Sequence, residues 1–176
     1  MDVNTYLTVG ERYYTPSYKT DIKGKENHDQ CLLFHSNRIC VICIAPTHPL
    51  IAENKSIEKV NFQVTEKVNR LENKVSGKSK KGGQWLTEDS PLCNVTCSDG
   101  SQYTICSCIK GKLIEVNEKL VSSPHLIIEK PQAEGYIGIV LTPKIGTGQK
   151  PQVKLLTADE YMQARKLEKI VKTPTN

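Results

Sequence analysis

An Asp-Gly pair between two strand-like runs constrains the fold of this chain more than any other feature. Residues 92–96 are strand-like, the polar segment 98–101 follows, and residues 103–109 return with Ile105 and Ile109 on the same parity. Asp-Gly readily adopts the left-handed backbone of a tight turn, so it is the strongest short signal for a β-hairpin. We therefore predict two antiparallel strands here, with Asp99-Gly100 at an exposed hairpin tip.

Further short apolar segments bounded by turn residues predict more strands, at 31–34, 39–45, 57–68, 113–116 and 136–141. The first two flank a polar turn at 35–38, which indicates a second hairpin that Pro46 and Pro49 end. Partial alternation in 57–68 places Val60, Phe62 and Val64 on one face of a half-buried strand. A weak internal repeat aligns Gly77 with Gly111, and we expect two tight turns in a quasi-symmetric β-structure.

Composition supports a mainly β fold. Val, Ile and Thr outnumber Leu, Ala and Met by two to one, and β-branched side chains favour strands. The length of 176 residues suits one domain with arms. No apolar run approaches the roughly 18 residues of a membrane span, and residues 1–10 lack a signal-peptide pattern. These features exclude an integral membrane protein and favour a soluble intracellular one.

The chain divides into an arm, one domain and a tail. Residues 1–27 are polar with scattered tyrosines, and we expect an N-terminal arm that lies on the domain. Residues 28–171 form the β domain, and 172–176 a tail. A capping box at Thr157–Glu160 predicts a C-terminal helix over about 157–171. Its apolar side combines Tyr161, Ala164, Leu167 and either Ile170 or Val171, and we expect it to pack on the sheet through Leu155, Tyr161 and Leu167.

Seven cysteines argue against a disulfide framework, because the number is odd. Cys40 and Cys43 form a CxxC, but Val41-Ile42 between them is poor turn chemistry for a zinc knuckle, and no second CxxC follows. We interpret the cysteines as small buried hydrophobes in a reducing compartment. No nucleophile stands beside a positioned base in a known local signature. We expect no catalytic residue, no metal and no cofactor.

The positive charge of the chain is concentrated in one segment. Residues 67–83 hold six basic residues and one acidic residue, a net +5, which equals the formal charge of the whole chain. A charge run is often only a solvated face. Here the entire excess of positive charge is clustered in one Gly-flanked stretch, which favours a docking surface for an acidic partner instead. The candidate contact residues are Lys67, Arg70, Lys74, Lys78, Lys80 and Lys81.

Residues 111–141 are similar to the corresponding stretch of the glycine-cleavage H-protein family. The shared residues are Gly111, Glu115, Asn117, Glu118, Pro124, Glu134, Gly135 and Tyr136, and residues 155–161 resemble the start of that family's C-terminal helix. The resemblance implies a barrel-sandwich hybrid, the lipoyl/biotinyl-like fold of two pseudo-symmetric β-sheets. It also implies a lysine at the hairpin tip that carries a lipoyl group. Here Gly100 occupies that position, and residues 82–109 contain no lysine.

A closer resemblance covers nearly the whole chain and points to the Abitram family of actin-binding transcription modulators. It rests on segments 12–14, 21–25, 35–41, 73–78, 97–100 and 115–118. The resemblance implies a non-enzymatic protein that binds actin, influences filament assembly and cell projections, and resides in the nucleus, including speckles, as well as in the cytoplasm. It supplies no contact residues, so the basic segment is our own hypothesis.

Two alternatives remain. A lipoyl carrier is disfavoured because the hairpin tip offers no amine to acylate. A nucleic-acid binder would use the same basic segment, but stacking on bases requires aromatics among the charges. Only Trp85 is near, and we interpret it as core filler beside Leu86. We therefore expect no specific recognition of nucleic acid.

Overall fold

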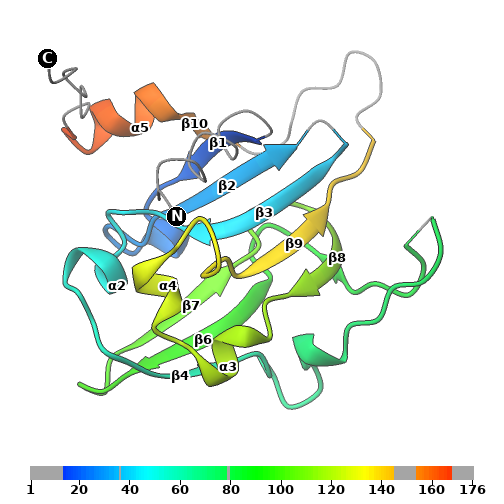
Figure 1. Cartoon of the computed structure of the whole chain (residues 1–176). Helices are drawn as coiled ribbons and strands as arrows, with labels where there is room; N and C mark the ends of the chain where they lie inside the picture. The colour runs from blue at the N-terminus through cyan, green and yellow to red at the C-terminus, as the bar shows by residue number, and fades with distance from the viewer. Residues whose placement is uncertain (1–13, 36, 79, 145–153, 168–176) are drawn as a thin grey trace, which may run out of the picture.

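Two antiparallel β-sheets enclose the core of the protein (Figure 1). The computed structural model describes residues 14–35, 37–78, 80–144 and 154–167. The larger sheet has the order β10-β1-β2-β3-β9-β8-β5 and the smaller one β4-β6-β7. The strands of the larger sheet are β1 (Tyr14–Lys19), β2 (Gln30–His35), β3 (Ile39–Ile44), β5 (Trp85–Leu86), β8 (Gly111–Val116), β9 (Gly138–Leu141) and β10 (Leu156–Thr157). Those of the smaller sheet are β4 (Ile57–Asn61), β6 (Pro91–Cys97) and β7 (Gln102–Cys106).

Short helical segments connect the strands. They are η1 (Ile22–Gly24), α2 (Pro49–Ala52), η2 (Arg70–Glu72), α3 (Lys119–Ser122), α4 (Leu126–Glu129) and α5 (Ala158–Ala164). Among the residues that the structure describes, no helix is long and apolar enough to cross a membrane. Because the helical segments are short and the strands form both sheets, the mainly β architecture predicted from composition is confirmed.

Both predicted hairpins are present. Strands β6 and β7 pair antiparallel around a turn in which Gly100 has a φ of 86° and the Gly100 amide donates to the Cys97 carbonyl at 3.0 Å. Gly100 is exposed, so the predicted hairpin tip is confirmed. Strands β2 and β3 form the other hairpin, whose turn is held by a 2.7 Å hydrogen bond between His35 Nδ1 and Asn37 Oδ1.

The core lies between the two sheets. Phe62, Leu32 and Ile105 are at most 1% exposed and belong to one cluster that draws on both sheets. The side chain of Gln30 also joins the two sheets. Its Nε2 donates to the backbone carbonyl of Cys106 at 2.7 Å, and its Oε1 accepts from the backbone amide of Cys106 at 3.0 Å. This pairing imitates one rung of a strand ladder, so it satisfies buried backbone groups at the edge of β7.

Part of the expected N-terminal arm is a strand of the larger sheet. Strand β1 pairs with β2 along its whole length and with β10 on its other side. Tyr18 is buried and stacks on Tyr161 of α5, with ring centroids 4.0 Å apart. The alternating side chains of Tyr14, Pro16 and Tyr18 share one face, which is the pattern of a strand. The expectation of an arm was therefore wrong for residues 14–19, and residues 1–13 lie outside the described part.

The repeated glycines have different roles. Gly77 lies in a turn with a φ of 71°, as predicted. Gly111 instead begins β8, where a Cβ atom would lie 2.5 Å from the Leu141 carbonyl oxygen of neighbouring β9. The expectation of a tight turn at Gly111 was wrong, because this glycine is required by a close approach of two strands rather than by a positive φ.

The capping box is confirmed, but α5 is shorter than predicted. The Glu160 amide donates to Thr157 Oγ1 at 3.2 Å, and the Thr157 amide donates to Glu160 Oε1 at 3.1 Å. The helix ends at Ala164 because Arg165 turns toward Asp29 and Lys166 takes a φ of 53°. Tyr161 and Leu155 pack as expected, whereas Leu167 is 39% exposed. The predicted positions 170 and 171 lie outside the described residues.

Replacing Thr157 with Ala should lower the free energy of unfolding by about 0.5–2 kcal/mol, because the Glu160 amide loses the hydroxyl that accepts its hydrogen bond. Urea unfolding checks this, with Thr157→Ser as the matched control that keeps the hydroxyl. Equal stability of the Ala and Ser variants would contradict a role of the cap in docking α5.

Candidate protein-binding surfaces

The hairpin tip that a lipoyl carrier would use is a self-contained polar turn. Asp99 accepts hydrogen bonds from the Ser101 amide at 2.9 Å and from the Ser101 hydroxyl. Its other carboxylate oxygen lies 2.7 Å from Lys55 Nζ. These partners, the Lys55 ammonium first, hold the pKa of Asp99 far below its ordinary value.

Lys55 is a residue at the tip that the sequence analysis missed. It follows α2, far from the hairpin in sequence, and it also lies 3.7 Å from Glu53. The hydrogen bond to Asp99 raises the pKa of Lys55, which keeps its amine protonated. Because the Lys55 ammonium is held by Asp99 and Glu53, the geometry favours a structural ion pair over an attachment point for a cofactor.

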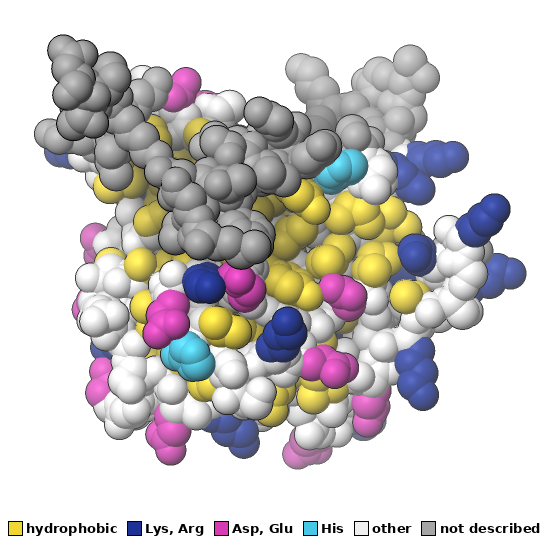
Figure 2. Space-filling view, in the orientation of Figure 1, with side chains coloured by type: hydrophobic (Ala, Val, Ile, Leu, Met, Phe, Trp, Pro, Cys, Tyr) yellow, Lys and Arg dark blue, Asp and Glu magenta, His cyan; other side chains and the backbone are white. Residues whose placement is uncertain are grey.

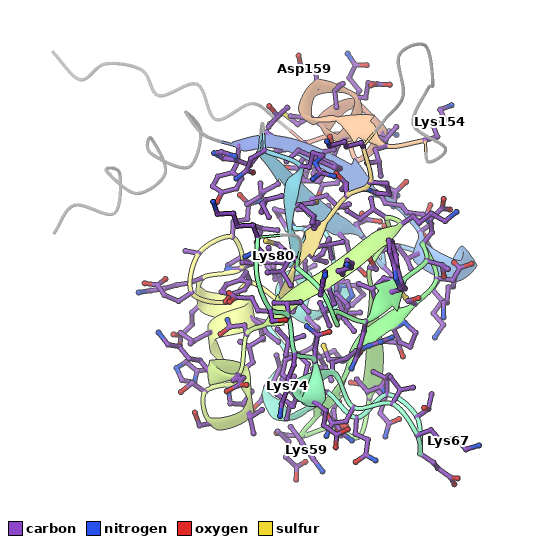
Figure 3. All side chains as sticks on the ribbon, turned by 90° about the vertical axis from the view of Figure 1, so that its right-hand side faces the viewer. Lys59, Lys67, Lys74, Lys80, Lys154 and Asp159 are labelled. Atoms are coloured by element: carbon purple, nitrogen blue, oxygen red, sulfur yellow. The ribbon has the colours of Figure 1, made fainter. Side chains whose placement is uncertain are left out.

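The predicted basic residues do not form one cluster. Lys67, Lys74, Lys78 and Lys81 are exposed and Lys80 is half-buried. Figure 3 shows Lys67 on a loop well away from Lys80, with Lys74 between the two in height. Lys67 is therefore separate from the lysines that follow it.

Arg70 is not part of a solvent-exposed surface, which corrects the sequence-based hypothesis. It is only 7% exposed, donates from Nε to the Pro91 carbonyl at 2.9 Å and donates to Gln84 Oε1 at 2.7 Å. Burial lowers the pKa of Arg70. Because its donors are satisfied inside the protein, Arg70 supports the base of the basic segment instead of contacting a partner.

Residues 74–78 and 80–82 belong to a small hairpin, which we call the lysine loop. Ser76 and Lys81 exchange two backbone hydrogen bonds, of 2.9 and 3.0 Å. Gly82 passes so close to the Lys74 carbonyl that a Cβ atom there would lie 2.9 Å from its oxygen.

The base of the lysine loop is pinned to the larger sheet. The Gln84 amide donates to Asn73 Oδ1 at 2.7 Å, and Asn73 Nδ2 donates to the Leu113 carbonyl of β8 at 2.9 Å. Lysines on a loop with a fixed base can meet a partner without a large ordering cost.

Trp85 is exposed, so its interpretation as core filler was wrong. It is 69% exposed, whereas its neighbour Leu86 is 1% exposed. On the two-residue edge strand β5 successive side chains point to opposite faces, and Trp85 points outward. Lys112 lies directly across the ladder, with its Nζ 5.4 Å from the ring centroid.

The cysteines lie inside the fold. All seven are buried with free thiols. Cys40 belongs to the cluster between the sheets and Cys43 to the cluster under α5, so the two CxxC residues lie on opposite faces of β3. Burial raises the pKa of Cys40 and Cys43 well above the ordinary thiol value, which disfavours the nucleophilic thiolate. Within the described residues no group of His, Cys, Asp and Glu side chains is arranged to hold a metal ion.

Comparison with known proteins places the chain in a family. It is 49% identical to Protein Abitram of Danio rerio over 154 residues, which is 88% of this chain and 86% of that protein. Protein Abitram of Homo sapiens is 48% identical over 86% of this chain and 83% of its own length. Identity to Protein Abitram of Dictyostelium discoideum is 36% over 91% of this chain and 89% of that protein. The chain belongs to the Abitram family.

The fold relationship predicted from residues 111–141 is also confirmed. The family model of the glycine cleavage H-protein matches residues 51–169. A crystal structure of the glycine cleavage system H protein from Mycobacterium marinum superposes with a TM-score of 0.58 and 18% identity. The superposition covers 87% of this chain and 98% of the H protein chain. This Abitram-family chain therefore has the barrel-sandwich fold of the H-protein, with a C-terminal helix.

Proposed function

We propose that this chain is a non-enzymatic actin-binding protein that modulates actin polymerisation and the dynamics of cell projections such as filopodia and dendrites. The proposal includes a second role in modulating transcription, with the protein in nuclear speckles and in the cytoplasm, including projections. Membership of the Abitram family supports it. The structural observation that carries it is the lysine loop, which presents exposed positive charge on an anchored base.

The chemistry of the loop suits an acidic protein surface. Lysine is a hydrated point charge on a long stem, so it tolerates imprecise geometry. Its contacts speed encounter more than they add affinity, and each exposed pair contributes about 0.2–1 kcal/mol. Lys74, Lys78 and Lys81 carry this role, with Lys80 in support. Lys67 is too far along the surface, and Arg70 is buried.

Reversing the charge of Lys78, Lys80 and Lys81 together to Glu should weaken co-sedimentation with purified actin by about tenfold or more, because three attractions become repulsions. A single Lys→Ala change should have little effect. Parent binding should fall as salt rises, since the Debye length shrinks to about 8 Å at physiological ionic strength.

The matched control is Lys59→Glu/Lys110→Glu/Lys119→Glu, which changes the net charge equally at three exposed positions outside the loop. It should bind nearly as the parent does. If the loop variant and this control co-sediment with actin equally well, the lysine loop is only a solvated face. If the parent itself does not co-sediment, the proposal of actin binding fails.

A further inference from the structure

The outer face of the larger sheet is covered by a helix over only part of its area. Helix α5 packs on β1 and β10, where Tyr161, Tyr18 and Cys31 form one cluster. Leu33 and Val41 pack against the edge of that cluster. Strands β3, β9, β8 and β5 continue the sheet beyond it, and no described helix packs on their outer side (Figure 1). Figure 2 shows hydrophobic side chains gathered over β3, β9 and β8.

The register of the strands places these side chains in two continuous cross-strand rows. In the first row Ile39 pairs with Leu141, Leu141 with Lys112, and Lys112 with Trp85. In the second row the paired residues run across five strands: Pro16, Leu33, Val41, Ile139 and Glu115. Residues of one parity share a face, so all of these side chains point away from the core. We call the two rows the sheet-face surface.

The size of this surface matches one α-helix. Neighbouring strands are about 4.8 Å apart, so the first row spans roughly 14 Å over four strands and the second roughly 19 Å over five, and rows two residues apart lie about 7 Å from each other. A helix is about 10 Å across and rises about 1.5 Å per residue, so 14 residues are about 21 Å long. A helix of about 14 residues laid along the rows would therefore cover both of them with one apolar stripe.

The charge around the sheet-face surface favours an acidic partner. Exposed Arg38 directly precedes Ile39, and exposed Lys144 follows Leu141 closely. Lys112 lies inside the first row, held over the Trp85 ring. Figure 2 shows Lys and Arg side chains along the right-hand margin of the hydrophobic area. The one acidic member of the rows, Glu115, accepts a 2.8 Å hydrogen bond from the Tyr136 hydroxyl.

We propose that the sheet-face surface docks an acidic amphipathic helix of a partner protein, with the apolar stripe on the two rows and carboxylates against Arg38, Lys112 and Lys144. Helix-in-groove recognition of this kind uses apolar anchors at i, i+3, i+4 and i+7. Trp85 has the character of an anchor residue, because exposed tryptophan is enriched where partners bury their contacts. This surface is distinct from the lysine loop and does not rest on actin as the partner.

The test uses the fluorescence of Trp85, which is the only tryptophan of the chain. Full-length protein is titrated with a synthetic 14-residue helical peptide that has a Leu stripe flanked by Glu and contains no aromatic residue. We expect a blue shift of Trp85 emission and saturable binding. A scrambled peptide of the same composition, and a peptide with Lys in place of Glu, should each bind at least about tenfold more weakly.

Two double variants and one matched control separate binding at this surface from unspecific effects. Val41→Thr/Ile139→Thr keeps strand propensity while placing hydroxyls in the second row, and it should weaken binding about tenfold. Val121→Thr, at a 52% exposed residue of α3, is the matched control and should bind as the parent does. Lys112→Gln/Lys144→Gln should weaken binding and reduce its salt dependence. Thermal melts verify that each variant is folded.

Three results would overturn the proposal. The first is equal binding of all three peptides, and the second is no emission shift with the acidic peptide. The third is a parent protein that sediments as a dimer and becomes monomeric in Val41→Thr/Ile139→Thr, because the occupant would then be a second copy of the chain. Retained actin co-sedimentation by that variant would show that the two surfaces are independent.

Discussion

Replacing Arg165 with Met should lower the free energy of unfolding by about 3–5 kcal/mol, because it leaves a buried carboxylate without its cation. Asp29 is 0% exposed, and Arg165 donates to both of its oxygens, from Nε at 2.8 Å and from a terminal nitrogen at 2.7 Å. That terminal nitrogen also donates to Asp21 at 2.7 Å. Urea unfolding measures this loss. The midpoint urea concentration should fall, while the slope of the free energy of unfolding against urea concentration stays the same.

The double variant Asp29→Asn/Arg165→Met tests the cause. Asparagine at position 29 removes the buried charge, so the double variant should regain part of the stability that Arg165→Met loses. In the parent the Asp21 amide and the Thr47 hydroxyl donate to different oxygens of Asp29. Asn keeps one oxygen that can accept from the Asp21 amide, and its NH2 group can donate to the Thr47 hydroxyl. If Arg165→Met alone costs less than about 1 kcal/mol, the pair behaves like an exposed salt bridge and the argument from burial fails.

The same pair predicts a pH dependence. Burial alone would raise the pKa of Asp29, but hydrogen bonds from Arg165, Thr47 and the Asp21 amide outweigh it and hold the pKa below its ordinary value of 3.8. Because the pKa of Asp29 is lower in the folded protein than in the unfolded one, the stabilisation by its ionised carboxylate is fully present above about pH 4. This stabilisation is lost as the pH falls through the pKa of Asp29 in the folded protein. The stability difference between parent and Arg165→Met should therefore narrow as the pH falls from 7 to 3.

Buried His48 adds a loss of stability at low pH to both proteins. Burial lowers the pKa of His48 from 6.5 to about 3, so both proteins lose stability as the pH falls below about 6.5, where the unfolded chain binds a proton. The part of this loss that burial causes cancels in the difference between parent and variant, and the Asp29 charge, which raises the pKa of His48, reduces the loss while Asp29 is ionised. A difference that stays constant between pH 7 and pH 3 would contradict the role of the Asp29 charge.

Replacing Phe62 with Ala should lower the free energy of unfolding by about 3–5 kcal/mol. Phe62 follows β4, is 1% exposed and belongs to the cluster between the two sheets, so its removal leaves a cavity that close-packed neighbours cannot fill. Phe62→Leu should cost much less because most of the volume stays.

Val64→Ala is the matched control for Phe62→Ala. Val64 is two residues further along and only half-buried. Its truncation should cost well under half as much, because part of the side chain is already in water. Urea unfolding of the three variants gives the comparison, and similar losses for Phe62→Ala and Val64→Ala would contradict the placement of the core.

Local signals in the sequence predicted the features that depend on neighbours in the chain. Asp99-Gly100 forms its turn through atoms within a few residues, and the capping box joins Thr157 to Glu160 across a single helical turn. The alternation after Ile57 correctly indicated that Val60 and Phe62 face inward, because Val60 lies in β4 and Phe62 directly follows it. The predicted strand was too long, however, since β4 ends at Asn61.

Contacts between distant residues caused the errors. The capping box and the apolar pattern after Thr157 would allow a longer helix, but Arg165 leaves it to meet Asp29, 136 positions earlier. Arg70 looks like a surface charge until Pro91 and Gln84 are placed beside it. Trp85 looks like core filler, since nothing near it in the sequence shows that β5 ends the sheet with its outer face uncovered.

Sequence patterns were enough to predict the mainly β class, the two hairpins, the capped start of α5, the concentration of positive charge in 67–83 and the resemblance to the Abitram and H-protein families. Each is a matter of residue types at short spacing. Three other features depend on the arrangement of strands in space: which of those charges reach solvent, the ion pair of Lys55 at the hairpin tip, and the alignment of Ile39, Leu141, Lys112 and Trp85 across four strands. Strand order and register come from packing energies summed over the whole chain, and no local pattern encodes that sum.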